Sequence, residues 1–200
     1  VGYASLSANT TGTANVAVGK SALDVNTTGS TNTAVGADSL GGNTTGGSNT
    51  ALGQAALESN TTASFNTAVG RNALLLNTTG ANNTAVGKDS LFTNSTGAYN
   101  VALGANSLQA NTTGGNNTAS GYQALKDNTT GSYNTAFGRL ALRDNTIGTE
   151  NTGLGNASAL SITTGNYNTA VGSDSLKYTT SGSNNTAVGV DALQASTTAS

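Results

Sequence analysis

The sequence repeats itself every 17 residues, and this period constrains the fold more than any other feature. Segments such as NTAVGADSLGGNTTG and NTAVGKDSLFTNSTG recur along the whole chain, each beginning with an asparagine. The repeats begin at Asn15, Asn32, Asn49, Asn66, Asn83, Asn100, Asn117, Asn134, Asn151, Asn168 and Asn185. Residues 1–14 align with the end of a further copy, which makes about twelve copies. A fixed period is typical of solenoids, in which each repeat packs only on its neighbours.

Composition alone would indicate a disordered chain. Charged residues make up 8% and aromatic residues 4%, and the chain has no Pro, Cys, Met, Trp or His. The strict period argues against disorder, because a disordered tract has no physical reason to keep its register. We therefore predict one repeat domain over residues 1–200. Since the first and last copies are incomplete, we expect it to be a segment of a longer fibrous protein.

One copy, counted from its first asparagine, reads N-T-A-V-G-x-x-[AS]-L-x-x-N-T-T-G-x-x. Position 4 is apolar except at Ser120, and position 9 is leucine except at Ala159. The segment NTAVG is short, β-branched and closed by glycine, which predicts a strand and a corner; NTTG predicts a second strand more weakly. Seventeen residues are too few for the helix pairs of most helical repeats. We predict an all-β parallel β-solenoid of about twelve coils, stacked at about 4.8 Å each.

The repeat also predicts which positions face inward. All charged residues fall at positions 6, 7, 10, 11 or 17, which we expect to face water, and the asparagines at positions 1 and 12 are expected to form ladders. Position 5 supplies the predicted corner glycines Gly19, Gly36, Gly53, Gly70, Gly87, Gly104, Gly121, Gly138, Gly155, Gly172 and Gly189. Positions 4 and 9 supply the predicted core residues Val18, Leu23, Val35, Leu40, Leu52, Leu57, Val69, Leu74, Val86, Leu91, Leu103 and Leu108. Alternatively, one of these two rows faces a partner chain, because a narrow coil has little room for both.

Two local features depart from the simple repeat. In the copy that starts at Asn151 the leucine comes one place late, at Leu160, and Ile162 replaces an asparagine, which we interpret as an insertion and a deletion that cancel. Position 17 carries a ring on every second copy, at Phe65, Tyr99, Tyr133 and Tyr167. We favour the interpretation that a ring needs two coils of height; the alternative is a stacking platform for a sugar or base.

The motifs for chemistry are weak. Lys20 and its neighbours Gly19 and Ser21 resemble the end of a phosphate-binding loop, but Ala14 stands where its first glycine is required. The absence of His and Cys removes the usual nucleophile pairs and zinc ligands.

Two pairs of acids fall on neighbouring coils, at a spacing close to that of retaining glycosidases. They are Asp127 with Asp144 and Asp174 with Asp191, all at positions expected to be solvated. We predict no enzyme activity, and no catalytic, cofactor-binding or metal-binding residues.

Charge and hydropathy restrict the partners. A net charge of −2 gives no electrostatic footprint for nucleic acid, and no apolar run is long enough to predict a membrane span in this segment. Two large apolar side chains per coil contribute roughly 3–6 kcal/mol, whereas ordering a coil costs on the order of 17–34 kcal/mol of backbone entropy. We therefore expect self-association to add apolar contacts.

The pattern NTAVGxxALxxNTTG resembles the head repeats of trimeric autotransporter adhesins, and also repeats in tail-fibre-type proteins of phages and bacteria. The resemblance implies a left-handed parallel β-roll or β-helix, with three chains packed side by side at a cell surface or on a virion. We therefore expect an extracellular structural or adhesive fibre segment that forms a homotrimer or filament. A cell-surface or glycan receptor is expected without being identified.

Two alternatives stay open. The paired threonines of positions 13 and 14, such as Thr27 and Thr28, could form a flat array that binds ice. The chain could also be a glycan-coated surface filament, although N-x-[ST] matches arise by composition alone in such a repeat. The candidate glycosylation sites are Asn26, Asn43, Asn60, Asn77, Asn94, Asn111 and Asn128, with further matches at Asn9, Asn82, Asn116, Asn156 and Asn184.

Overall fold

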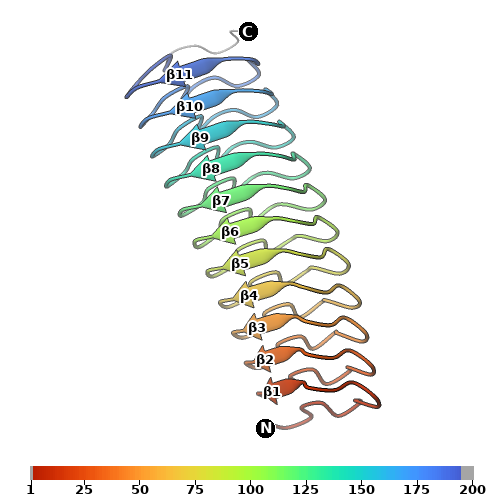
Figure 1. The fold of residues 1–200 in the computed structure, drawn as a ribbon. Coiled ribbons are helices and arrows are strands. Elements are labelled where there is room, and N and C mark those ends of the chain that lie inside the picture. The colour runs from red at the N-terminus through yellow and green to blue at the C-terminus, as the bar shows by residue number, and fades with distance from the viewer. Residues whose placement is uncertain (1, 195–200) are drawn as a thin grey trace.

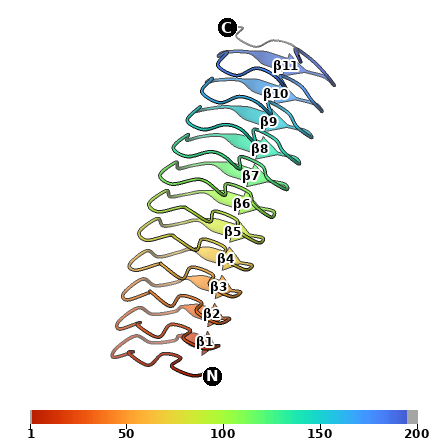
Figure 2. The ribbon, with the colours of Figure 1, turned by 180° about the vertical axis from the view of Figure 1, so that it is seen from behind.

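The computed structural model describes residues 2–194 and has one short strand in each coil from Asn15 onward. The strands are β1 (Val16–Val18), β2 (Thr33–Val35), β3 (Thr50–Leu52), β4 (Thr67–Val69), β5 (Thr84–Val86), β6 (Val101–Leu103), β7 (Thr118–Ser120), β8 (Thr135–Phe137), β9 (Thr152–Leu154), β10 (Thr169–Val171) and β11 (Thr186–Val188). They form a single sheet in chain order. Figure 1 shows the coils stacked into a rod with β1 and β11 at opposite ends, and Figure 2 shows the wall of turns behind the sheet. The described residues contain no helix long and apolar enough to cross a membrane.

The register confirms the all-β parallel solenoid. In the pairing of β2 with β3, Thr33 lies opposite Thr50 and Ala34 opposite Ala51, an offset of one 17-residue copy. Every other neighbouring pair keeps this offset. Eleven strands are separated by ten turns, so the count of about twelve coils was approximate. Residues 2–14 belong to a copy without its first three positions, and they form no strand. The left-handed sense stays a prediction.

Only one of the two predicted strands forms, and the prediction for NTTG is wrong. Here the chain bends: the amides of Thr27 and Thr28 both donate to the carbonyl of Thr44 in the next coil. Thr27 Oγ1 donates to the same oxygen at 3.0 Å. Because one carbonyl accepts three donors, the segment forms a laddered turn rather than an extended ladder. The hydroxyl bond recurs at Thr10, Thr44, Thr61, Thr78, Ser95, Thr112, Thr129, Thr146 and Thr163.

The leucines of position 9 fill the core as predicted. The completely buried side chains include those of Leu23, Leu40, Leu57, Leu74, Leu91 and Leu108. They belong to one cluster with the alanines in the middle of the strands, such as Ala34 and Ala51, which are also completely buried. A large residue from one wall of the coil and a small one from the other fill the narrow interior without crowding.

The prediction that position 4 belongs to the core is wrong. Val18, Val35, Leu52, Val86 and Leu103 are 38–43% exposed, and Val69 is half-buried. The reason is the alternation of side chains along a strand. Because the middle alanine points inward, the residues before and after it must point outward. The alternative that one apolar row faces away from the coil is the one that the structure supports.

The predicted corner glycines are confirmed. Gly19, Gly36 and Gly53 have φ angles of 136°, 137° and 138°, a region that side chains disfavour. A Cβ on Gly19 would also lie 2.4 Å from the carbonyl oxygen of Gly36. The positive φ recurs at Gly70, Gly87, Gly104, Gly121, Gly138, Gly155, Gly172 and Gly189.

Two ladders of buried asparagines run through the interior, as predicted. At position 12, Nδ2 of Asn43 donates to Oδ1 of Asn26 at 2.8 Å, and eight such bonds link consecutive coils from Asn9 to Asn145. At position 1, the amide of Asn49 donates to Oδ1 of Asn32 at 3.0 Å. The two ladders meet at position 15, where Nδ2 of Asn32 and of Asn43 both donate to the Gly46 carbonyl. These bonds satisfy polar groups that the coil buries.

The coil that starts at Asn151 keeps its register, so the interpretation as an insertion and a deletion is wrong. Ala159 takes the place of the core leucine, Ile162 is completely buried in the same cluster, and Leu160 is only half-buried. The larger Ile162 side chain fills the space that Ala159 leaves. It also interrupts the asparagine ladder, and Oδ1 of Asn145 is consequently buried without a hydrogen-bond partner.

Candidate functional surfaces

The outward side chains of the strands form an uncharged surface, which we call the sheet face. It consists of positions 2 and 4 of β1–β11. Position 2 is threonine except at Val16 and Val101. Position 4 contributes Val18, Val35, Leu52, Val69, Val86, Leu103, Ser120, Phe137, Leu154, Val171 and Val188. Methyl, methylene and hydroxyl groups therefore cover the whole length of the sheet.

The sheet face is comparable in area to the largest apolar patch of a typical monomer. Ten steps of about 4.8 Å give a length near 48 Å, and three residues across give a width of about 10 Å. The area is therefore about 500 Å². The largest apolar patch on a typical monomer covers about 300–600 Å² and is often functional. Position 4 is exposed in eight of the eleven strands, from 38% at Val35 to 70% at Val188, and half-buried at Val69, Ser120 and Val171.

The threonine pairs divide into two rows with different roles. The hydroxyls of position 13 donate to the next coil, as described above, and stabilise the stack. Position 14 is exposed in the coils from Asn15 to Asn184. This outer row comprises Thr28, Thr45, Thr62, Thr79, Thr96, Thr113, Thr130 and Thr164, with Ile147 and Ser181 in the two remaining coils. A flat threonine array must therefore use position 14, or the threonines of the sheet face.

The rings of position 17 form a second exposed row. Phe65, Tyr99, Tyr133 and Tyr167 are 64%, 62%, 62% and 54% exposed, respectively. Each of them has a left-handed backbone, with φ between 58° and 63°. They lie immediately before the asparagine that leads into the next strand, on the side of the sheet where the strands begin.

Three of the four acids in the predicted pairs form ion pairs within their own coils, and Asp191 accepts a hydrogen bond from Gln194. Asp127 lies 3.4 Å from Lys126 Nζ, Asp144 pairs with Arg143, and Asp174 lies 2.7 Å from Lys177 Nζ. The hydrogen bond to Asp144 raises the pKa of the Arg143 guanidinium. Hydrogen bonds from Lys177 and Ser173 lower the pKa of the Asp174 carboxyl, whereas a general acid needs a raised one.

The phosphate-loop resemblance has no structural counterpart. Gly19 forms the corner after β1, Lys20 is exposed, and turns rather than a helix follow. A phosphate-binding loop places its anion at a helix N-terminus.

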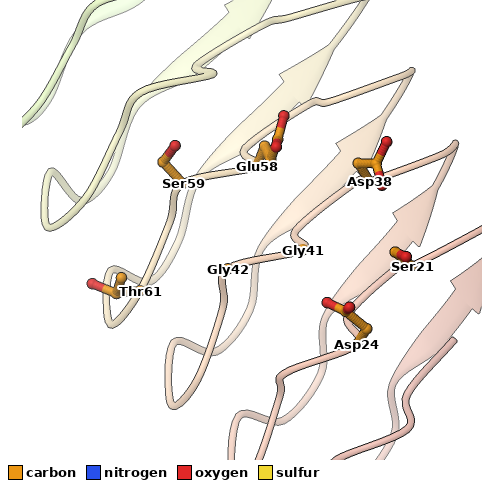
Figure 3. Close-up of a pocket in the computed structure, with 8 residues that line it drawn as sticks. All are labelled: Ser21, Asp24, Asp38, Gly41, Gly42, Glu58, Ser59 and Thr61. Carbon is orange, nitrogen blue, oxygen red and sulfur yellow. The ribbon is translucent and has the colours of Figure 1, made fainter. Parts of the chain in front are cut away.

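A shallow open hollow lies where two glycines leave side chains out. Gly41 and Gly42 occupy positions 10 and 11 of their coil, and the hollow beside them measures about 460 Å³. Figure 3 shows the carboxyl groups of Asp24, Asp38 and Glu58 spread along it rather than directed at one point. Among residues 2–194, no group of three acids, histidines or cysteines is arranged to hold a metal ion.

The candidate glycosylation sites at position 12 are corrected by the structure. Asn26, Asn43, Asn60, Asn77, Asn94, Asn111 and Asn128 are all completely buried. Their Nδ2 atoms, to which a sugar would be attached, donate within the ladder. A glycan there is incompatible with the folded coil. Among the N-x-[ST] motifs, those whose asparagine side chain is exposed are at Asn82, Asn116, Asn156 and Asn184.

No family model, no curated protein and no solved structure matches this chain. The resemblance to adhesin head and tail-fibre repeats therefore stays a prediction, and function has to be argued from the surfaces. Sequence reasoning placed position 4 in the core and left open, as an alternative, that one of the two apolar rows faces outward. The signal was present, because alanine at position 3 and leucine at position 9 already supply one small and one large side chain to the interior.

Proposed function

We propose that this chain is a structural and adhesive fibre segment, a stiff rod whose copies pack side by side through the sheet face. The observation that carries the proposal is the uncharged row at position 4, which is apolar except at Ser120 and exposed in eight of the eleven strands. The resemblance to surface and virion fibres adds the expectation that the rod works outside the cell.

A second copy of the chain is the occupant that the spacing favours. The outward side chains recur once per coil, every 17 residues, at a spacing of about 4.8 Å. A partner surface can interdigitate over this length only if its side chains have the same spacing. A second copy of the chain has that spacing because it has the same repeat. Two sheet faces pressed together would form a dry interface of the kind seen between stacked in-register sheets.

Area and charge also fit a second copy. About 500 Å² from each chain gives about 1,000 Å² in total, near the lower limit for a specific interface. The sheet face carries none of the chain's charged residues, so no charge has to be desolvated or matched. Each further coil would add its share of area, which makes the association stronger for longer rods.

The experiment is a measurement of mass in solution with matched variants. By light scattering, the unmodified chain is expected to show two or three times the 19.5 kDa of a monomer, or larger filaments, in a concentration-dependent manner. The variant Val69→Lys, Val86→Glu, Leu103→Lys introduces charges on the sheet face and is expected to be monomeric.

The matched control places the same charges on the same three coils at position 14, as Thr79→Lys, Thr96→Glu, Thr113→Lys. All three threonines are exposed, and we expect this control to associate like the unmodified chain. An unmodified chain that stays at 19.5 kDa up to millimolar concentration would refute the assembly.

Ice binding is a second candidate, supported by the regular exposed threonines of position 14 and the mostly half-buried threonines of position 2. The sheet face presents a hydroxyl and a methyl beside an aliphatic group in most coils, an arrangement able to order water. The measurement is thermal hysteresis. Activity that disappears in the sheet-face variant but not in the position 14 control would support this candidate, and no hysteresis at high concentration would remove it.

A further inference from the structure

We propose that the exposed rings Phe65, Tyr99, Tyr133 and Tyr167 form a binding platform for a neutral, extended polysaccharide of the β-1,4-linked type. We call these four residues the ring row. The inference rests on the proposed function, because it names the surface and the ligand class for the adhesive role. It uses a different surface from the sheet face through which copies are proposed to associate.

The backbone at the ring row argues that the rings are not there for stability. A left-handed backbone is unfavourable for bulky residues and well tolerated by asparagine, which occupies the same position at Asn82, Asn116 and Asn184. Packing in the core would offset that strain, but all four rings are more than half exposed. Rings kept at a strained, solvent-exposed position indicate a use outside the coil.

The spacing of the rings selects the shape of the ligand. Consecutive rings are 34 residues apart, which is two coils. Two coils rise about 10 Å, which is also the length of one disaccharide unit in an extended β-1,4-linked chain of pyranose rings. In such a chain each sugar is turned over relative to its neighbour, so every second sugar presents the same face. One aromatic ring on every second coil therefore meets the same face of the glycan at each contact.

The polar groups between the rings fit hydroxyl-rich ligands. Asn82 and Asn116 are exposed on the coils between rings, and their amides can both donate to and accept from sugar hydroxyls. Glu150 occupies the third gap and offers a carboxylate acceptor. Stacking on rings with polar groups alongside is the arrangement in which an amphipathic sugar face is recognised.

The lack of positive charge along the ring row argues against nucleic acids and anionic glycans as ligands. The only charged residue at position 17 is Glu150, and positions 16, 1 and 2 carry no charge. A nucleic-acid strand or an anionic glycan needs cations along its path, and this row supplies none. The platform is open rather than enclosed, which suits a polymer bound along its length.

The test uses the whole chain and four polymers. Retention is measured on cellulose and chitin particles, with amylose, an α-linked helical glucan, as the geometric control and heparin as the anionic control. Affinity is then measured by calorimetry with soluble oligosaccharides of the polymer that retains the chain. We expect retention on a β-1,4-linked polymer and none on amylose or heparin.

The decisive variant replaces all four rings with asparagine, the residue at position 17 of several other coils: Phe65→Asn, Tyr99→Asn, Tyr133→Asn, Tyr167→Asn. Affinity should fall by about tenfold or more, because four ring contacts are lost together. The melting temperature should stay the same or rise, since asparagine tolerates the left-handed backbone. The matched control removes exposed rings elsewhere, as Tyr122→Asn, Tyr178→Asn, and should bind as before.

Three results would overturn the inference: no retention on either β-linked polymer, equal binding by the ring-row variant, or an equal loss in the Tyr122 and Tyr178 control. Light scattering on the same samples separates this inference from the proposed function. If the ring-row variant still associates while glycan binding is absent throughout, only the platform fails. If it no longer associates and no glycan binds, the rings belong to the contact between copies.

Discussion

Ile162 interrupts the asparagine ladder, so the contribution of the ladder to stability can be tested by restoring a missing bond rather than by removing one. Oδ1 of Asn145 is buried and has no partner, because Ile162 stands where the next ladder asparagine would donate to it. The perturbation is the double substitution Ala159→Leu, Ile162→Asn, which returns positions 9 and 12 of this coil to the consensus. The new asparagine should donate to Asn145 Oδ1 and to the Gly165 carbonyl, as Asn145 does to Asn128 and Gly148.

The magnitude follows from the burial of both side chains. A buried acceptor without a partner costs about 1–3 kcal/mol, and the repair removes that cost. Ile162→Asn alone should give no net gain, because losing a fully buried isoleucine side chain costs about 1.5–3 kcal/mol. Ala159→Leu alone should destabilise the coil by about 1–3 kcal/mol, since the added volume competes with Ile162. Only the double variant avoids both costs.

The assay is thermal unfolding of the unmodified chain, both single variants and the double variant. For a chain of this size each kcal/mol shifts the melting temperature by about 2–4 °C, so the double variant should melt about 2–12 °C higher than the unmodified chain. Because repeat arrays need not unfold in one step, amide exchange near Asn145 provides a local readout of the same repair.

The four melting temperatures form a double-mutant cycle that can refute the reasoning. We expect a favourable coupling of at least about 1 kcal/mol between positions 159 and 162. If the double variant melts at or below the temperature of the unmodified chain, the unpaired Asn145 acceptor is not a cost to the fold. If Ile162→Asn alone stabilises as much as the pair, Ile162 is not filling space left by Ala159.

Three further predictions test the assignment of inward and outward positions. Leu91→Ala should lower the free energy of unfolding by about 2–5 kcal/mol, because Leu91 is completely buried. Val86→Ala on the same coil should lower it by less than about 1 kcal/mol in a monomeric sample. Denaturant midpoints in the reverse order would contradict the assignment. Gly87→Ala should lower the free energy of unfolding by at least about 1–3 kcal/mol, because Gly87 has φ 134° and an added Cβ would lie 2.6 Å from the Gly104 backbone. The control Gly47→Ala, at a position where other coils carry alanine, should change it by less than about 1 kcal/mol. Burial alone would raise the pKa of the Asp89 carboxyl, but hydrogen bonds from Lys88 and Asn72 and nearby positive charges lower it below its ordinary 3.8. Asp89 therefore stabilises the fold above about pH 4, and this contribution should disappear as the pH falls through the lowered pKa. Acidification should therefore lower the melting temperature of Asn72→Ala by less than that of the unmodified chain.

The period was enough to predict the solenoid, because identical residues can recur every 17 positions over most of the chain only if they occupy equivalent places. The invariant glycine at position 5 and the asparagines at positions 1 and 12 were also readable. A glycine that never varies needs a special backbone, and an amide that recurs inside a stack can pair with its own copies. These inferences need only the chemistry of single residues.

The direction of the apolar rows was harder to predict from composition. Leu40 and Leu91 have left-handed backbones with φ 49°, which no leucine propensity predicts. The position 9 side chain is buried in the coil, and in most coils it fills the interior together with the alanine of position 3 and the small residue of position 8. Val35 and Val86 are consequently left outside. The outcome depends on the shape of the closed coil rather than on how apolar each residue is.

The same geometry explains why function has to be sought on the outward positions. Three non-glycine residues per coil, at positions 7, 9 and 17, hold left-handed conformations at a cost of roughly 1–2 kcal/mol each, or about 3–6 kcal/mol in total. Leucine burial, ladder bonds and the backbone bonds between coils must offset this cost, so the inward positions cannot vary freely. The outward positions are not needed for this, and the rings and all charged residues except the buried Asp89 are found there. A regular interior beneath a variable exterior can present different ligands or partners without changing the rod that carries them.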